Sequence, residues 1–381
     1  SAFIQARLGP MRVGPWGLLQ PAADGLKLLL KEDIIPIKAD KLVFSIAPII
    51  SVVATLVVLA VIPWGAAWAT IANVNIGLLF VLAVSSVSVL GLVLAGWSSN
   101  PKYSLLGALR SSAQMVSYEV GMGLSIIGAL IFARTLSLSG IVEAQRADGL
   151  PYFLFQPLGF LIYLVSALGE TNRAPFDLPE AESELVAGYH TEYSGFRWAL
   201  FFMAEYTAML ITSAVAVTLF LGGWYFPGLD WVRTNIGQTT YVLVSVAAFA
   251  AKIALLIYAY MWFRWTWPRY RYDQLMELGW KWLIPAGLVN VVLTGIWYVL
   301  ALPASQGGVF GFVRKIGERY VPTGTGKIYF IITGFIITIP LSWALLATIN
   351  RRSRDFNLHE QRQLQIRLRS ERIKRNEPVA E

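Results

Sequence analysis

The sequence contains no cysteine and only two histidines, His190 and His359. Iron–sulfur clusters are held by cysteine thiolates, and a structural zinc ion requires four cysteine or histidine ligands. We therefore expect no metal site and no iron–sulfur centre in this chain, so an electron carrier that works with it must lie in another protein. The lack of cysteine also removes disulfides as an indicator of the compartment.

Charged residues are scarce as well. They make up 14% of the 381 residues, against 56% hydrophobic residues, and the mean hydropathy is +0.57. Soluble proteins carry about a quarter charged residues. A surface this apolar would aggregate in water but is stable in lipid, so the composition predicts an all-α integral membrane protein.

Long stretches without charge predict about eight membrane-spanning helices, since one span requires roughly 20 apolar residues. No charged residue lies between Lys41 and Lys102, which leaves room for two spans separated by a polar break at Thr70, Asn73 and Asn75. The expected spans are 42–64, 77–96, 111–133, a shorter one within 149–169, 198–222, 237–263, 282–302 and 327–349.

Basic residues are distributed unevenly between the two sides of this arrangement. The segments 1–41, 97–110, 170–197, 264–281 and 350–381 hold 23 of the 31 lysines and arginines, and the opposite loops hold seven. Because basic loops stay on the cytoplasmic side, we expect these segments in the cytoplasm, or in the matrix of an organelle. The expected location is the inner (plasma) membrane of a bacterial cell, with an organellar inner membrane as the alternative.

These features divide the chain into four parts. The first contains an arginine-rich turn and an amphipathic helix over 18–31, which lies in the membrane interface or packs under the bundle. The tail is basic and is expected to contact lipid headgroups. The four parts are the cytoplasmic residues 1–41, the transmembrane bundle 42–302 with its loops 170–197 and 264–281, an extra C-terminal hairpin or transmembrane helix at 303–350, and the cytoplasmic tail 351–381.

The segment from Glu170 to Glu192 departs from the basic bias of the cytoplasmic side, because it contains six of the 23 acidic residues. Acids in the first turns of a helix that starts at Pro179 would complement the helix dipole, but this explains only two or three of them. Crowded carboxylates beside a region of low dielectric raise one another's pKa, so some can hold a proton near neutral pH. A proton relay requires this property.

Three ionisable residues lie inside expected spans: Glu119, Glu205 and Lys252. A charge at the centre of a bilayer costs at least about 2.5 kcal/mol, and such residues usually face the protein interior on a proton or ion path. The alternative is an ion pair that only holds helices together. With Glu192, we expect Glu119 and Glu205 to form a chain of carboxylates from the cytoplasmic loop into the bilayer, and we assign Lys252 to the same path.

Two further cytoplasmic loops combine arginine with turn-forming or aromatic residues. Residues 7–15 read RLGPMRVGP, a pair of Gly-Pro turns that carries Arg7 and Arg12, and residues 264–276 read RWTWPRYRYDQLM. Arginine and aromatic side chains are ordinary anchors at a membrane interface, so either loop alone would indicate little.

Together these segments resemble the membrane subunit of respiratory complex I, the NADH:quinone oxidoreductase, that abuts the peripheral arm. The matching stretches are 7–21 with 31–33, 170–195, 202–206 and 264–281, in the same order, so the resemblance covers roughly residues 3–300. It implies a subunit of a proton-translocating enzyme that forms most of the quinone chamber and couples quinone reduction to proton movement.

The resemblance also implies roles for single residues. Arg7 and Arg12 would shape the cytoplasmic rim of the chamber, and Glu192, Glu119 and Glu205 would continue an acidic route inward. The loop at the floor of the chamber would contain Arg173, Phe176, Asp177, Glu180, Glu182 and Glu184. Structural ion pairs that brace the chamber loops would come from Arg264, Arg269, Arg271 and Asp273.

Quinone is the implied substrate, with no covalently bound cofactor in this chain; NAD, flavin and iron–sulfur clusters would lie in partner subunits. The implied partners are peripheral iron–sulfur subunits at the quinone site, small and antiporter-like membrane subunits, and lipids, with no nucleic acid. Members of the family have one more span before the arginine turn. We expect that this span is missing here because the start of the chain is truncated or processed. Met11 stands where asparagine is usual, and the span at 327–349 and the tail exceed the common length.

Three other functions are open at this point. The related subunit of a hydrogenase or another complex-I-like enzyme would share much of the sequence, but the intact loop 170–184 favours the quinone branch. A stand-alone ion transporter would show broken helices at the midplane and a repeated half, and neither is evident. A purely structural anchor for the peripheral arm would not need Glu119, Glu205 and Lys252.

Overall fold

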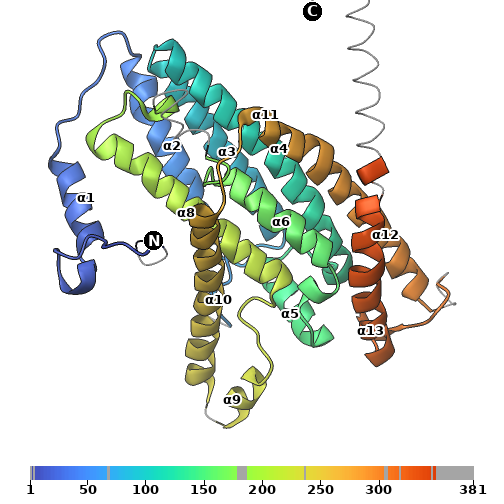
Figure 1. The fold of residues 1–381 in the computed structure, drawn as a ribbon. Coiled ribbons are helices and arrows are strands. Elements are labelled where there is room, and N and C mark those ends of the chain that lie inside the picture. Colours follow the sequence, from blue (N-terminus) through green and yellow to red (C-terminus); the bar gives the residue numbers. More distant parts are fainter. Residues whose placement is uncertain are drawn as a thin grey trace, which may run out of the picture.

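The charge-free runs of the sequence form long helices that pack side by side in the computed structural model (Figure 1). The structure describes residues 2, 5–66, 69–177, 187–235, 237–303, 308–316, 319–344 and 346–348. Three of the predicted loop acids, Glu180, Glu182 and Glu184, and the basic tail 351–381 lie outside the described residues.

Seven helical segments of the described part are long and apolar enough to cross a membrane, which confirms the predicted multi-pass helical class. Two of them consist of more than one element: Tyr272–Ala301 contains α11, η5 and α12, and Gly324–Thr348 begins with α13 and η7. The elements are α2 (Lys41–Leu59), α3 (Gly77–Ser98), α4 (Lys102–Ala133), α8 (Gly195–Phe220), α10 (Gln238–Thr266), α11 (Tyr272–Glu277), η5 (Leu278–Leu283), α12 (Ile284–Ala301), α13 (Gly324–Ile332) and η7 (Thr333–Thr338).

The fourth predicted span is the shortest. Helix α6 (Pro157–Glu170) has 14 residues, or about 21 Å at 1.5 Å per residue, against a hydrocarbon core of roughly 30 Å. Pro157 lies in its first turn, where the missing N–H of proline costs no hydrogen bond, so the helix begins there rather than near residue 149. The other end of α6 carries Glu170 into the interior of the bundle, where this residue is 9% exposed.

Helix α4 is longer than expected. From the sequence we expected a loop over 97–110, but α3 continues to Ser98 and α4 already begins at Lys102. Residues 102–110 contain no proline and only one glycine, so nothing in this stretch stops the helix. The 32 residues of α4 measure about 48 Å, which exceeds the thickness of the hydrocarbon core.

Several short elements were not expected from the sequence. Helices α5 (Leu138–Asp148) and α9 (Leu229–Asn235) and the 3-10 turns η3 (Tyr152–Leu154) and η4 (Gly188–His190) connect the long helices. Strands β1 (Val313–Ile316) and β2 (Arg319–Pro322) form an antiparallel hairpin in which Arg314 lies opposite Val321. Elements of three to eleven residues give no long periodic pattern, which is why charge-free runs do not indicate them.

The expected amphipathic helix is α1 (Gln20–Leu30), preceded by the turn η1 (Pro15–Gly17). It lies beside the start of α8 (Figure 1), where Arg197 and Asp33 form an ion pair at 3.2 Å. The described residues do not cover the apolar side of α1, since Leu26 and Leu30 are 61% and 85% exposed. An apolar face of this kind requires lipid or another protein to cover it.

Two apolar clusters form the core. The larger one joins α4, α6, α8 and α10, and a smaller one lies where α2, α3, α4 and the start of α8 meet η4. In the smaller cluster the ring of Tyr193 stacks on Phe44 at 4.0 Å between centroids, and Phe201 contacts Tyr193 edge-on. This packing fixes η4 against α8 and thereby positions the polar site described next.

Candidate functional site

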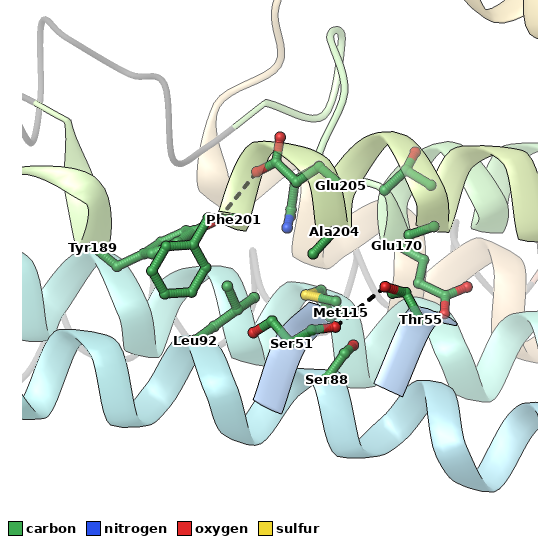
Figure 2. A pocket seen from close by; sticks show the side chains of 13 residues that line it. Ser51, Thr55, Ser88, Leu92, Met115, Glu170, Tyr189, Phe201, Ala204 and Glu205 are labelled. Carbon is green, nitrogen blue, oxygen red and sulfur yellow. Dashed lines mark hydrogen bonds between the residues drawn. The ribbon is translucent and has the colours of Figure 1, made fainter. Parts of the chain in front are cut away.

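A small cavity of about 40 Å³ lies between α2, α3, α4, the end of α6 and α8 (Figure 2). Two of its lining residues, Glu170 and Glu205, carry carboxyl groups into an otherwise apolar bundle. The lining consists of Ser51, Thr55, Ser88, Leu92, Met115, Glu170, Thr171, Asn172, Tyr189, Phe201, Ala204, Glu205 and Ala208.

Three polar side chains converge on the carboxyl group of Glu205. The hydroxyl of Tyr189 donates a hydrogen bond to Oε1 at 3.0 Å (Figure 2), and Nε2 of His190 lies 3.6 Å from the same oxygen. A guanidinium nitrogen of Arg173 lies 3.8 Å from Oε2, and the guanidinium group covers the ring of Tyr206 at 4.3 Å. We call Arg173, Tyr189, His190 and Glu205 the Glu205 cluster.

Many polar atoms of this region have no hydrogen-bond partner among the described residues. They include all three side-chain nitrogens of Arg173, Nδ1 of His190, Oε2 of Glu170 and Oδ1 of Asn172. Most buried polar atoms in proteins are hydrogen-bonded, because an unpaired one costs about 1–3 kcal/mol. The cavity region therefore has unused hydrogen-bonding capacity, which can be used by protons, by water or by other protein groups.

The turn that carries Tyr189 and His190 is held from two sides. Gly188 has a positive φ of 54°, and its Cα packs directly against Gly107 of α4, where a side chain on Gly107 would not fit. On the other side the hydroxyl of Tyr193 donates to the carbonyl oxygen of Phe44 at 3.2 Å. Burial raises the pKa of the Tyr193 phenol to about 12, so it remains a donor at neutral pH.

Glu170 connects this cavity to Glu119. Glu119 accepts a hydrogen bond from the hydroxyl of Ser86 on α3, and its carboxyl group is close enough to Glu170 for the two to interact electrostatically. Gln114 fixes the segment after Glu170, because its Nε2 donates to the carbonyl oxygens of Gly169 and Phe176, each at 2.8 Å. The carboxyl groups of residues 205, 170 and 119 thus follow one another through the bundle.

The structure adds Glu170, Tyr189 and His190 to the residues expected from the sequence. Glu170 directly follows the charge-free stretch that ends at Gly169, and this position was the available signal that it lies at the end of a span. Glu192, which we expected on the acidic route, is half-buried in the loop between η4 and α8 and does not line the cavity.

Lys252 lies elsewhere in the bundle. Its ammonium group donates three hydrogen bonds, at 2.7, 2.8 and 2.7 Å, to the backbone carbonyl oxygens of Leu221, Gly223 and Tyr225. These carbonyls follow the C-terminal end of α8, about 24 Å along the helix axis from Glu205. The expected grouping of Lys252 with the carboxylates is therefore not present in the structure.

The loop residues Phe176 and Asp177 contact the second arginine-rich loop. Nε of Arg269 donates to the carbonyl oxygen of Asp177 at 2.7 Å, and Nη2 also approaches its carboxyl group at 3.8 Å. The ring of Phe176 is buried between Tyr118 and Tyr270, with centroids 5.4 and 5.8 Å away. The segments 170–177 and 264–276 thus pack against each other beside the end of α6, and all of residues 170–177 except Ala174 are buried.

The remaining predicted site residues that the structure describes do not line the cavity. Arg7 is exposed and its Nε donates to Oε1 of Gln5 at 2.8 Å; Arg12 is exposed in the same N-terminal turn. The guanidinium group of Arg264 lies 5.4 Å from the ring centroid of Trp265. Arg271 and Asp273 are exposed at the start of α11, where the negative charge of Asp273 suits the helix N-terminus.

Comparison with known proteins decides the family. The sequence profile of the family described as NADH dehydrogenase matches residues 1–295. A curated relative from Rhodospirillum rubrum, which is named as a subunit of NADH-quinone oxidoreductase, is 52% identical over 291 residues, covering 76% of this chain and 84% of that protein. This chain belongs to the NADH dehydrogenase family and is a membrane subunit of NADH-quinone oxidoreductase, the respiratory complex I.

Other members of the NADH dehydrogenase family show similar agreement. NADH-quinone oxidoreductase subunit 8 of Rhodothermus marinus is 50% identical over 310 residues, covering 78% of this chain and 89% of that protein. The equivalent NADH-quinone oxidoreductase protein of Solibacter usitatus is 46% identical over 349 residues, covering 77% and 88%. The site described above lies within the matched residues, whereas the hairpin β1–β2 and α13 lie beyond residue 295.

The ionisable groups of the site are not arranged as metal ligands. Within the part of the chain that the structure describes, no group of three or more histidine or acidic side chains is placed to hold a metal ion. The groups that this chain contributes to the cavity and the Glu205 cluster are carboxyl, phenol, imidazole and guanidinium groups.

Proposed function

We propose that this chain lines the quinone-binding chamber of complex I and couples quinone reduction to proton translocation. One observation carries the proposal: the carboxyl groups of Glu205, Glu170 and Glu119 follow one another from the cytoplasmic-loop side of the bundle toward its outer surface. Carboxyl groups in a membrane interior are costly, and they usually mark proton paths.

The contacts of Glu205 suit a group that changes its protonation state. Tyr189 can stabilise the charged or the neutral carboxyl group. Arg173 supplies positive charge at 3.8 Å, and the imidazole of His190 lies at 3.6 Å, both beyond hydrogen-bond range. Neither protonation state leaves the group without a partner. Quinone reduction consumes two electrons and two protons, so it changes the local charge, and a carboxyl group held in this way can respond to that change.

We place the quinone-facing region where segments 170–177 and 264–276 pack against each other. Arg269 ties the backbone of Asp177 to the second loop, and both loops adjoin the end of α6 that carries Glu170. In this proposal the electrons come from an iron–sulfur subunit that docks at this region. Small and antiporter-like membrane subunits would take over the protons beyond Glu119.

The rival functions differ in what they require of the site. A hydrogenase-type subunit would use the same carboxyl groups without quinone, and the relatives reported above are all named for quinone. A purely structural anchor does not need a cavity whose buried polar atoms have no described partner. The observed site therefore favours coupling over anchoring.

The test is the substitution Glu205→Gln in the assembled complex, measured in proteoliposomes for quinone reduction by the complex and for proton pumping. The amide keeps the shape and the hydrogen bond from Tyr189 but cannot release a proton. We expect turnover and pumping to fall roughly tenfold or more, with normal assembly on a native gel. Glu143→Gln is the matched control, because Glu143 is an exposed residue of α5 outside the cavity.

Unchanged turnover and pumping in Glu205→Gln would contradict the proposal. Loss of assembly in Glu205→Gln, but not in Glu143→Gln, would favour the structural anchor instead.

A further inference from the structure

His190 is the one titratable side chain of the Glu205 cluster whose role neither the acidic loop nor the carboxylate route explains. It is 8% exposed and ends the short turn η4. Its ring lies against that of Tyr189, with centroids 3.8 Å apart, and Phe201 contacts it edge-on at 5.6 Å. The packing of Gly188 on Gly107 holds the turn in place, so the imidazole faces α8 in a defined position.

The two nitrogens of this imidazole have different surroundings. Nε2 lies 3.6 Å from Oε1 of Glu205, whereas Nδ1 is buried and has no hydrogen-bond partner among the described residues. A histidine can take up a proton at one ring nitrogen and release one from the other. The geometry of the ring thus provides one nitrogen for the carboxyl group and leaves the second one for proton entry.

We propose that His190 exchanges a proton with Glu205 and is a catalytic residue of the coupling step, an inference that rests on the proposed function. The imidazolium gives the proton from Nε2 to Oε1, which leaves a neutral imidazole and a neutral carboxylic acid. The net charge of the pair is unchanged and no electron moves. The remaining proton stays on Nδ1, so the imidazole must first return to the Nε2–H tautomer before Nδ1 can accept a new proton.

The distance of 3.6 Å makes this contact dependent on charge. It exceeds the hydrogen-bond range by about 0.5 Å, so the neutral imidazole leaves Oε1 to the hydroxyl of Tyr189. An imidazolium beside a carboxylate is attracted and can close this gap by a small rotation of either side chain. Transfer therefore occurs only after His190 has been charged, which gives the step a direction.

In the described part of the chain, few charged groups lie around His190. Arg173 faces Glu205 from the segment after α6, and Tyr189 belongs to the same turn. Helix α3 contains no charged residue, and on α4 the guanidinium group of Arg110 lies over the ring of Tyr272 at 5.5 Å. On α8, Arg197 pairs with Asp33. Among the described residues, the pH response of the pair should therefore depend on His190, Glu205 and Arg173, together with Glu192, which is half-buried two residues after His190.

The test uses His190→Asn and His190→Ala in the whole complex, reconstituted in proteoliposomes, between about pH 6 and 9. Asparagine retains a polar amide near the position of Nδ1 but carries no exchangeable charge. We expect turnover and pumping to fall roughly tenfold or more, with a changed pH profile, and millimolar imidazole to restore His190→Ala in part. Tyr189→Phe removes a hydrogen bond to the same oxygen and should not respond to imidazole.

Wild-type turnover and an unchanged pH profile in His190→Asn would overturn the proposal. So would a loss of activity with an unchanged profile and no response of His190→Ala to imidazole, since a purely structural role predicts that result. Glu205→Gln separates the two proposals. If its turnover and pumping are those of the wild type, the proposed function fails. If Glu205→Gln lowers both while His190→Asn changes neither, only the role of His190 fails.

Discussion

Two buried polar clusters lie toward opposite ends of α8, and they differ in how completely their hydrogen bonds are formed. In the Glu205 cluster, Glu205 receives one hydrogen bond of 3.0 Å, and its other polar neighbours stay 3.6 and 3.8 Å away. We call the second cluster the Lys252 cluster; it consists of Gln145, Lys252 and the backbone of residues 218–225. Its hydrogen bonds are 2.7–3.1 Å long and use every donor of the two side chains except one amide hydrogen.

The Lys252 cluster acts as a scaffold. The ammonium group of Lys252 neutralises the negative end of the α8 dipole and pairs carbonyls that would otherwise be unpaired in an apolar surrounding. Gln145 joins the same loop to α5, because its amide donates to the carbonyl of Thr218 and accepts from the backbone N–H of Tyr152 and Gly222. An ammonium group whose three protons are all held in hydrogen bonds, such as that of Lys252, is poorly suited to pass them on. The Glu205 cluster can rearrange, because only one of its contacts is a short hydrogen bond.

The largest expected effect comes from removing the hydrogen bonds of the Lys252 cluster. Lys252→Met removes three charge-assisted hydrogen bonds and leaves three carbonyl oxygens unpaired, so we expect a loss of at least roughly 3 kcal/mol and failure of the subunit to assemble. Native gels and thermal unfolding of the complex provide the measurement. Lys281→Met is the matched control, since that lysine makes an exposed ion pair with Glu277, and such pairs contribute about 0–1 kcal/mol. An assembled Lys252→Met complex that has lost only pumping would place Lys252 on the proton path after all.

A smaller loss is expected where η7, which continues α13, meets the start of α6. A side chain at Gly334 would collide with the carbonyl oxygen of Phe155 and the ring of Pro157, so Gly334→Leu should push the two helices apart and destabilise the subunit by about 1–3 kcal/mol. Turnover of the molecules that assemble should be retained, because Glu170 lies at the other end of α6. Gly295→Leu is the control, since open space surrounds Gly295 on α12. Equal melting temperatures for the two variants would show that η7 does not support α6.

In the Glu205 cluster, Tyr189→Phe should affect function more than stability. It removes the single short hydrogen bond of Glu205, so we expect a several-fold lower turnover but a stability loss of about 1 kcal/mol or less. Steady-state quinone reduction and thermal unfolding, measured on one preparation, test both statements. A large stability loss with normal turnover would reverse the contrast between the two clusters.

The smallest effect is expected at Tyr193. Tyr193→Phe removes the hydrogen bond to the carbonyl of Phe44 and should cost about 1 kcal/mol. Burial raises the pKa of this phenol from 10.0 to about 12, so its contribution is fully present below pH 10 and is lost only as the pH rises toward 12. The stability difference between variant and wild type should therefore be constant from about pH 6 to 9. A difference that changes within that range would mean that another group titrates through this contact.

The sequence predicted the membrane-spanning helices well, because a helix that crosses the hydrocarbon core needs a charge-free run of roughly 20 apolar residues. The predicted starts of the spans at 77 and 237 differ from those of α3 and α10 by no more than one residue. The start of α4 was wrong by nine residues, because a helix that continues past the membrane surface is no longer limited by hydropathy. Hairpin β1–β2 and helix α5 depend on contacts with distant segments, which a local pattern does not contain.

The candidate site was only partly accessible from sequence. Depth in a span marked Glu119, Glu205 and Lys252 in the same way. In the structure Glu119 and Glu205 are half-buried, and Lys252 binds carbonyls about 24 Å from Glu205 along α8. Which ionisable groups share a cavity depends on the packing of helices far apart in the chain. The contribution of His190 depends on the turn at Gly188 and on its contact with Gly107, neither of which leaves a signal in hydropathy.

Glu170→Gln tests the central claim most directly, because Glu170 lines the cavity with Glu205 and adjoins Glu119. The quantity to measure is the number of protons pumped per pair of electrons in proteoliposomes, with Glu143→Gln as the control. Our account predicts an assembled complex whose pumping falls roughly tenfold or more. A wild-type ratio of protons to electrons at a wild-type rate would contradict it, and would mean that the protons take a route that does not pass through this cavity.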